Sequence, residues 1–338
     1  MSGMRAGASS SSGLALARAK YALEAAHLDT NVELTRASSV TNEVWLTPEY
    51  AIRVNRRPDH RLRREAKIGP HLPPEVHYPE VVAYGTGTGF DWLVLRRRPG
   101  NVLSRCWPTM APSQRRLAVR QLAYMLRALH QSTSPVGLED AGAPQLLQGG
   151  QGQNPTTPLL VGLERARGLE NVDPAIVDAL VDIVRGTSRH LEPFDVQTLI
   201  HGDLTFENVL WEGDQVTALI DFEWSRAAPP DLDLDVILRF CAFPHLHVAL
   251  DYAEQTKPED YEDVAWWFRE DYPQLFSFPY AIDRLRLYSI AYDVRDLLAF
   301  PPEQPPTKLP AEHSVNRLTR IVTRRSYLDN FAGPDARF

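Results

Sequence analysis

The chain has 338 residues, a formal net charge of −7, 43% hydrophobic residues and 23% charged residues. This length and composition are typical of a globular protein with one or two domains and an ample core. The negative net charge disfavours a nucleic-acid partner. No apolar run is long enough for a membrane span, so we expect no membrane partner.

The charge is unevenly distributed along the chain. Residues 1–100 contain 14 Lys and Arg against 10 Asp and Glu, or +4, and the remainder contains 22 against 33, or −11. A basic first part would suit phosphates and an acidic second part a cationic or hydroxylated ligand, although scattered surface charge accounts equally well for the numbers. The two cysteines, Cys106 and Cys241, show no metal-binding spacing and fit a reducing cytoplasm.

The first hundred residues predict a small antiparallel sheet. Residues 1–13 are rich in Ser, Gly and Ala without the apolar segment of a secretory signal, and we expect them to be disordered. A helix is predicted at 14–27, followed by strands at 31–36, 43–46, 50–55, 81–84 and 92–95. The small-residue loop at 37–42 could close its backbone N–H groups over phosphates, and a plain hairpin is the alternative.

Arg53 lies between apolar residues in the third predicted strand. By alternation its side chain shares a face with Ala51 and Asn55, where a charge needs a partner. Glu65, on the helix predicted at about 58–71, is the natural partner, and a surface arginine on an edge strand is the alternative.

The rest of the chain is predicted to be mainly helical. The clearest helix covers residues 113–131, because Leu122, Met125, Leu126 and Leu129 recur at helical spacing. Further helices are predicted near 158–168, 173–191, 280–300 and 312–331, and residues 131–157 read as a long loop. A short strand at 196–200 leads into the most informative stretch of the chain.

That stretch contains His201-Gly202-Asp203, then Asn208, then Asp221. Strands predicted at 209–211 and 216–220, with a turn between them, would bring Asn208 and Asp221 together. An amide and a carboxylate supply hard oxygen ligands, which suit Mg²⁺ on a nucleotide's phosphates. A further carboxylate at Asp203 could orient a hydroxyl for attack.

The spacing H-G-D-x-x-x-x-N followed by a hydrophobic residue and Asp-Phe-Glu resembles the aminoglycoside phosphotransferase family of small-molecule kinases. The resemblance implies an α+β, bilobal, protein-kinase-like fold, with a nucleotide-binding lobe at 14–98 and a helical lobe at 99–338. It implies that Asp203 is catalytic and that Asn208 and Asp221 hold Mg²⁺. ATP or GTP would then be bound by Arg53, Glu65, Ser38, Ser39 and Asn42 at the phosphates and by the backbone of Leu95 and Arg96 at the purine.

The resemblance also implies supporting and substrate-binding residues. His201 and Asp233 would support the catalytic loop, Asp233 through the family's Pro-x-x-Asp element that begins at Pro230. Candidate substrate residues are Glu223, Trp224, Asp231, Asp235, Trp266 and Trp267. Asp231 and Asp235 could instead be helix N-terminal charges, and the acidic and aromatic stretch 251–271 could instead be an ordinary amphipathic helix.

The expected activity is transfer of the γ-phosphoryl group of ATP or GTP to a hydroxyl of a small molecule, with an antibiotic as first choice. A kinase for choline, homoserine, a sugar or a glycated amine is the alternative, and a non-catalytic nucleotide-binding scaffold is a third. A protein kinase is disfavoured, because the loop at 37–42 lacks glycine and the segment after Asp221 is short. We expect a cytoplasmic monomer or homodimer.

Overall fold

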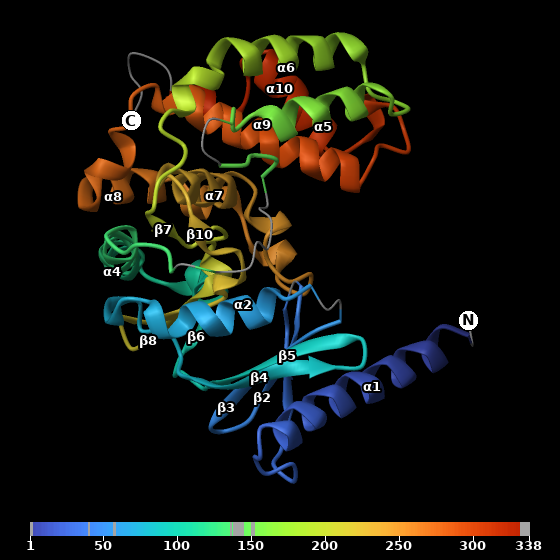
Figure 1. Ribbon diagram of the computed structural model, residues 1–338, viewed down its shortest axis with the longest axis vertical. Coiled ribbons are helices and arrows are strands. Elements are labelled where there is room, and N and C mark those ends of the chain that lie inside the picture. The colour runs from blue at the N-terminus through green and yellow to red at the C-terminus, as the bar shows by residue number, and fades with distance from the viewer. Residues whose placement is uncertain are drawn as a thin grey trace.

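The computed structural model describes residues 3–39, 41–56, 59–135, 137, 145–149 and 153–331. A β-sheet with helix α1 lies at one end of the elongated molecule, and helices α5, α6, α9 and α10 gather at the other (Figure 1). This is the predicted α+β architecture. No helix in the described ranges is both long and apolar enough to cross a bilayer.

The sheet has the predicted five antiparallel strands, and their order is β1-β2-β3-β5-β4. They are β1 (Thr35–Ala37), β2 (Glu43–Leu46), β3 (Tyr50–Asn55), β4 (Val81–Gly87) and β5 (Phe90–Arg96). The second and third strands have the predicted bounds, whereas β1 is shorter than predicted and β4 and β5 are longer.

One helix packs on each face of the sheet. On β5, Trp92 and Val94 belong to the cluster formed with α1 (Gly3–Ala25), while Leu93 and Leu95 pack against α2 (Arg61–Ile68). This alternation follows from the period of two along a strand. Helix α1 begins at Gly3, whereas the sequence predicted a helix that begins at residue 14.

The remainder is mainly helical and has its own apolar core. Its helices are α3 (Leu103–Cys106), α4 (Pro112–His130), α5 (Thr157–Arg167), α6 (Pro174–Thr187), α7 (Asp231–Ala242), α8 (Val264–Asp271), α9 (Ala281–Ala299) and α10 (Ser314–Val322). The predicted final helix is divided, since α10 ends at Val322 and only a short 3₁₀ segment follows at Tyr327–Phe331.

Short strands flank the stretch from His201 to Asp221. They are β6 (Asn101–Val102), β7 (Leu199–Ile200), β8 (Val209–Glu212), β9 (Gln215–Leu219) and β10 (Arg226–Ala227). Strands β8 and β9 form the predicted hairpin, with Gly213 and Asp214 both at positive φ in the turn. Strand β10 pairs with β7, so the chain after Asp221 returns to the residues just before His201.

Candidate active site

A cleft of about 1210 Å³ lies between the sheet and the helical part. The sheet side contributes Val44, Leu46, Ala51 and Leu95, and the helical side contributes Asp203, Asn208 and Asp221. Ser38, Ser39, Asn42, Arg53 and Trp224 also line it. Most of the predicted site residues therefore meet in one cavity.

Asp233 holds the start of the catalytic loop. Its carboxylate accepts hydrogen bonds from the backbone N–H groups of His201 at 2.8 Å and Gly202 at 2.7 Å. His130, at the end of α4, lies 3.0 Å from the same carboxylate through Nε2. Burial alone would raise the pKa of Asp233, but the His130 hydrogen bond and these neighbours lower it.

Gly202 is required by the geometry of this loop. Its φ is +85°, and a Cβ added there would lie 2.3 Å from the Trp224 carbonyl oxygen. The chain can therefore pass close to the segment after Asp221 only with glycine at this position.

The loop then presents Asp203 and Asn208 to the cleft. The Asn208 side chain donates from Nδ2 to the Asp203 carbonyl at 2.7 Å, and the Asn208 carbonyl accepts from Ile220 N–H at 3.0 Å. The loop and the end of β9 are thus joined directly. Loss of solvent around Asp203 raises the pKa of its carboxyl, and Asp221 and Glu223 raise it further.

Asp221 has a strained backbone. Its φ of +67° and ψ of +59° place it in the left-handed region, which costs about 1 kcal/mol or more for a residue with a side chain. Such backbone strain is found mainly at active sites and ligand-binding sites, and Asp221 lines the cleft.

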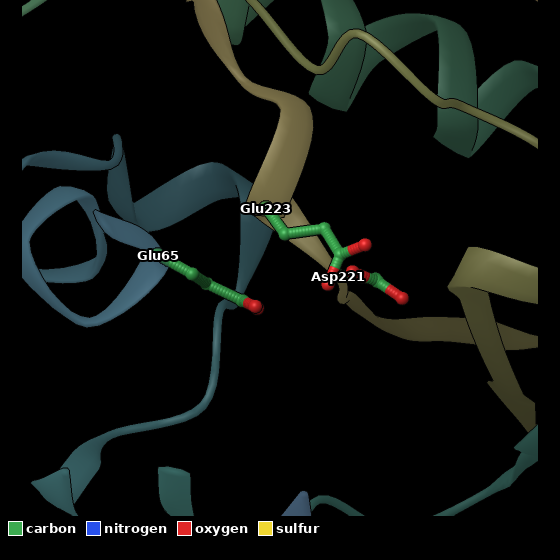
Figure 2. Close-up of side chains that lie close together, drawn as sticks. All are labelled: Glu65, Asp221 and Glu223. Atoms are coloured by element: carbon green, nitrogen blue, oxygen red, sulfur yellow. The ribbon is translucent and has the colours of Figure 1, made fainter. Parts of the chain in front are cut away.

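Arg53 lies at the centre of three carboxylates. Its guanidinium is 2.5 Å from Glu65, 2.7 Å from Asp221 and 3.3 Å from Glu223. Figure 2 shows Glu65 entering from the helix side and Glu223 from the segment after Asp221. Burial by itself lowers the pKa of Arg53, and the three carboxylates raise it overall. The predicted pair between Arg53 and Glu65 is present.

These same three carboxylates have oxygen atoms within 4.8 Å of one another, close enough to hold a metal ion. The guanidinium of Arg53 contacts all three, however, so it is the cation that neutralises this cluster. Asn208 and Asp221 are the predicted residues that could hold a divalent ion. The Asn208 Nδ2 is turned to the Asp203 carbonyl, which leaves Oδ1 as the amide atom available for a hard cation.

Glu223 is a buried anchor and does not line the cleft. Its carboxylate accepts from Asn42 at 2.9 Å and from Arg61 at 3.2 Å, in addition to Arg53. Burial raises its pKa to about 7, and Asp221 adds to the effect. Our prediction of a substrate contact at Glu223 was wrong. These bonds hold its side chain between the sheet part and the helical part, away from the cleft.

The loop after β1 covers the cleft and is fixed by side chains. The Ser38 hydroxyl donates to Asp251 at 2.6 Å, and the Ser39 hydroxyl donates to the Asn42 carbonyl. Ser38 and Asp251 thus join the sheet part to the helical part across the cleft. The predicted contact of this loop with phosphates stays a prediction.

Leu95 and Arg96 line the cleft where β5 ends. The Arg96 N–H donates to the Glu80 carbonyl at 2.8 Å, so this donor is not available to a purine. The backbone of β5 therefore offers fewer groups to a purine than we expected, because strand pairing uses one of them.

Four further substrate predictions are corrected. Asp231 is buried and bound by Arg284 at 2.5 and 2.9 Å. Asp235 is fully buried beside Arg239, and burial raises its pKa to about 7. On α8, Trp266 is 41% exposed and Trp267 packs against the apolar core of the helical part. None of the four lines the cleft.

Sequence reasoning missed several cleft residues. Among these are Arg105 and Glu207, and Tyr252, Tyr292 and Arg295 from the second half of the chain. Helix α9 was predicted, but which of its faces meets Asp203 depends on tertiary packing. Parts of the loop predicted at 131–157, namely residues 136, 138–144 and 150–152, lie outside the described residues.

The fold and this arrangement of Asp203, Asn208, Asp221 and Arg53 define a kinase-like phosphotransferase. The model of the "Phosphotransferase enzyme family" matches residues 33–267, well over half of the chain. The chain therefore belongs to this family, and it is a phosphotransferase that acts on hydroxyl groups of small molecules.

Solved structures share the fold. A thermostable mutant of aminoglycoside phosphotransferase APH(4)-Ia, with ADP and hygromycin B, has a TM-score of 0.57 at 17% identity, over 90% of this chain and 97% of that one. ADP-bound APH(2'')-Ib has a TM-score of 0.60 at 14% identity, over 88% and 95%. A candidate fructosamine-3-kinase from Haemophilus somnus has 0.57 at 14%, over 91% and 96%. No curated protein matches the sequence.

Proposed function

We propose that this enzyme transfers the γ-phosphoryl group of ATP or GTP to a hydroxyl of an antibiotic, with Mg²⁺ as cofactor. The observation that carries the proposal is the meeting of Asp203, Asn208, Asp221 and Arg53 in one cleft. Such an arrangement supplies the positioning and charge stabilisation on which phosphoryl transfer depends.

Each residue has a role in this proposal. Asp203 accepts a hydrogen bond from the attacking hydroxyl, orients it and takes its proton late in the reaction. Asn208 and Asp221 would hold the metal, which would supply positive charge to the phosphates when bound. Arg53, fixed by Glu65 at 2.5 Å, turns from Asp221 to the phosphates as nucleotide binds.

The support for an antibiotic acceptor comes from the similarity to APH(4)-Ia, whose complex holds hygromycin B. A metabolite acceptor is the second candidate, favoured by the similarity to the fructosamine-3-kinase. The choice concerns the acceptor alone, since the nucleotide side of the proposal is the same in both.

A labelled-phosphate transfer screen tests the proposal. Purified enzyme is incubated with γ-labelled ATP or GTP and Mg²⁺, and with a panel of antibiotics and hydroxylated metabolites. Asp203→Ala is the matched control. Label should pass to at least one acceptor with the wild-type enzyme and not with the variant. A wild-type enzyme that binds nucleotide but labels no hydroxyl would contradict the proposal.

A further inference from the structure

The cleft carries more cationic than anionic side chains. Among the described residues that line it, seven are arginines and four are carboxylates. The arginines are Arg53, Arg61, Arg96, Arg97, Arg98, Arg105 and Arg295, and the carboxylates are Asp203, Glu207, Asp221 and Asp296. Phosphates of a nucleotide would account for some of this positive charge, but not for cations beside the acceptor.

The part of the cleft that we call the acceptor end is lined by Asp203, Trp224, Leu246, His247, Tyr252, Tyr292, Arg295, Asp296 and Phe300. Two carboxylates near this end are already neutralised. Glu207 lies 3.4 Å from Arg105 and accepts from the Ser104 hydroxyl. The two oxygens of Asp296 lie 3.3 Å from Arg295 and 3.2 Å from Arg317. Of the carboxylates that line this end, Asp296 is paired with arginine, so a ligand ammonium group would meet Asp203 as the main negative charge of the lining.

The aromatic rings at the acceptor end already face guanidinium groups. The Arg61 guanidinium lies 4.6 Å from the Trp224 ring centroid, and that of Arg105 lies 4.6 Å from Tyr252. The Arg295 guanidinium lies 5.3 Å from the ring of Tyr292. On each of these rings, an arginine of the protein therefore occupies one of the two faces on which a cationic ligand could stack.

Apolar side chains border the same end. Leu246 and Phe300 both line the cleft, and their exposed fractions are 46% and 70%. Large apolar side chains that are exposed at the border of a cleft favour a ligand with an apolar surface of its own.

We propose that the acceptor is an uncharged, ring-bearing molecule with both hydroxyl groups and an apolar part, such as a neutral glycoside. A polyamine sugar or a quaternary ammonium alcohol would meet the positive charge of Arg105 and Arg295, and a guanidinium already lies over one face of each of these rings. This inference rests on the proposed function and selects among its acceptors.

Matched pairs of acceptors test the inference. Suitable pairs are choline and 3,3-dimethyl-1-butanol, glucosamine and N-acetylglucosamine, and kanamycin and its fully N-acetylated form. The value of kcat/KM is measured for each at saturating Mg-nucleotide. We expect the neutral member of a pair to exceed the charged member by about tenfold or more.

Two results would overturn the inference in different ways. A preference for the charged members would overturn it and leave the proposed phosphoryl transfer standing. Transfer to no hydroxyl by an enzyme that binds nucleotide would overturn the proposed function, and the inference with it.

A charge introduced at the cleft border adds a second test. Phe300→Asp removes apolar contact and adds a carboxylate, so KM for a neutral acceptor should rise about fivefold and KM for its charged partner should fall. Tyr124→Asp is the control, because Tyr124 is 54% exposed on α4 and does not line the cleft. Equal effects of the two variants, or no change in the ratio of KM values, would overturn the inference.

Discussion

Replacing Asp233 by asparagine separates support of the catalytic loop from general stability. The carboxylate accepts from two backbone N–H groups, those of His201 and Gly202, and contacts His130. A hydrogen bond to a charged group contributes about 1.5–3 kcal/mol. Asparagine keeps one acceptor oxygen but turns an NH₂ group toward the other N–H, so the expected loss is about 2–4 kcal/mol.

Part of this loss should be visible in turnover. If the free energy that holds Asp203 in place falls by about 2 kcal/mol, kcat falls about 30-fold. The assay compares kcat and acceptor KM at a temperature at which circular dichroism shows both proteins fully folded. A positioning role predicts a lower kcat at a nearly constant nucleotide affinity.

Asp231→Asn is the matched control, because Asp231 is a buried carboxylate on the same helix. It binds Arg284 through both oxygens and does not line the cleft. Both variants should unfold more easily, and only Asp233→Asn should lose turnover. Equal kcat values for the two folded variants would refute the reasoning.

Three further predictions concern buried charge. Arg53→Met leaves Glu65, Asp221 and Glu223 without their shared cation, so the free energy of unfolding in urea should fall by about 3–5 kcal/mol, with a smaller loss for Arg53→Lys. Asp221→Ala should weaken nucleotide binding in calorimetry about tenfold or more with Mg²⁺ present and far less without it. Burial raises the pKa of Asp235 from 3.8 to about 7. At a pH between these two values, the native state holds a proton at Asp235 that the unfolded chain has released. Its contribution to stability therefore falls as pH rises toward 7, and Asp235→Asn should gain about 3 kcal/mol relative to wild type between pH 5 and 8.

Each of these has a contrary outcome. Unchanged unfolding of Arg53→Met would mean that the three carboxylates are not held by the guanidinium. Equal loss of binding for Asp221→Ala with and without Mg²⁺ would argue against a metal ligand. A difference between Asp235→Asn and wild type that is independent of pH would show that Asp235 does not titrate in this range.

The sequence predicted those parts of the fold that depend on local periodicity. Alternation in β3 placed Arg53 on the face that meets Glu65, and turn residues placed the β8–β9 hairpin between Asn208 and Asp221. Helix α4 followed from the spacing of its leucines. These features are recoverable because each depends on residues close together in the chain.

Long-range packing explains what the sequence did not reveal. Nothing local shows that Asp231 meets Arg284 from α9, or that Glu223 is enclosed by Arg61 and Asn42. The acidic and aromatic stretch 251–271 suggested a binding surface, yet α8 uses its apolar face against α4. The acceptor end is formed by residues far apart in sequence, such as Tyr252 and Arg295, which no motif connects.

The central claim is that Asp203 serves phosphoryl transfer to a hydroxyl in this cleft. The most direct measurement compares wild type and Asp203→Ala for transfer of labelled γ-phosphate and for nucleotide affinity by calorimetry. The account predicts that kcat falls by about 10²–10⁴-fold, while the nucleotide Kd stays within about twofold. Turnover close to that of wild type in the folded variant would contradict the account.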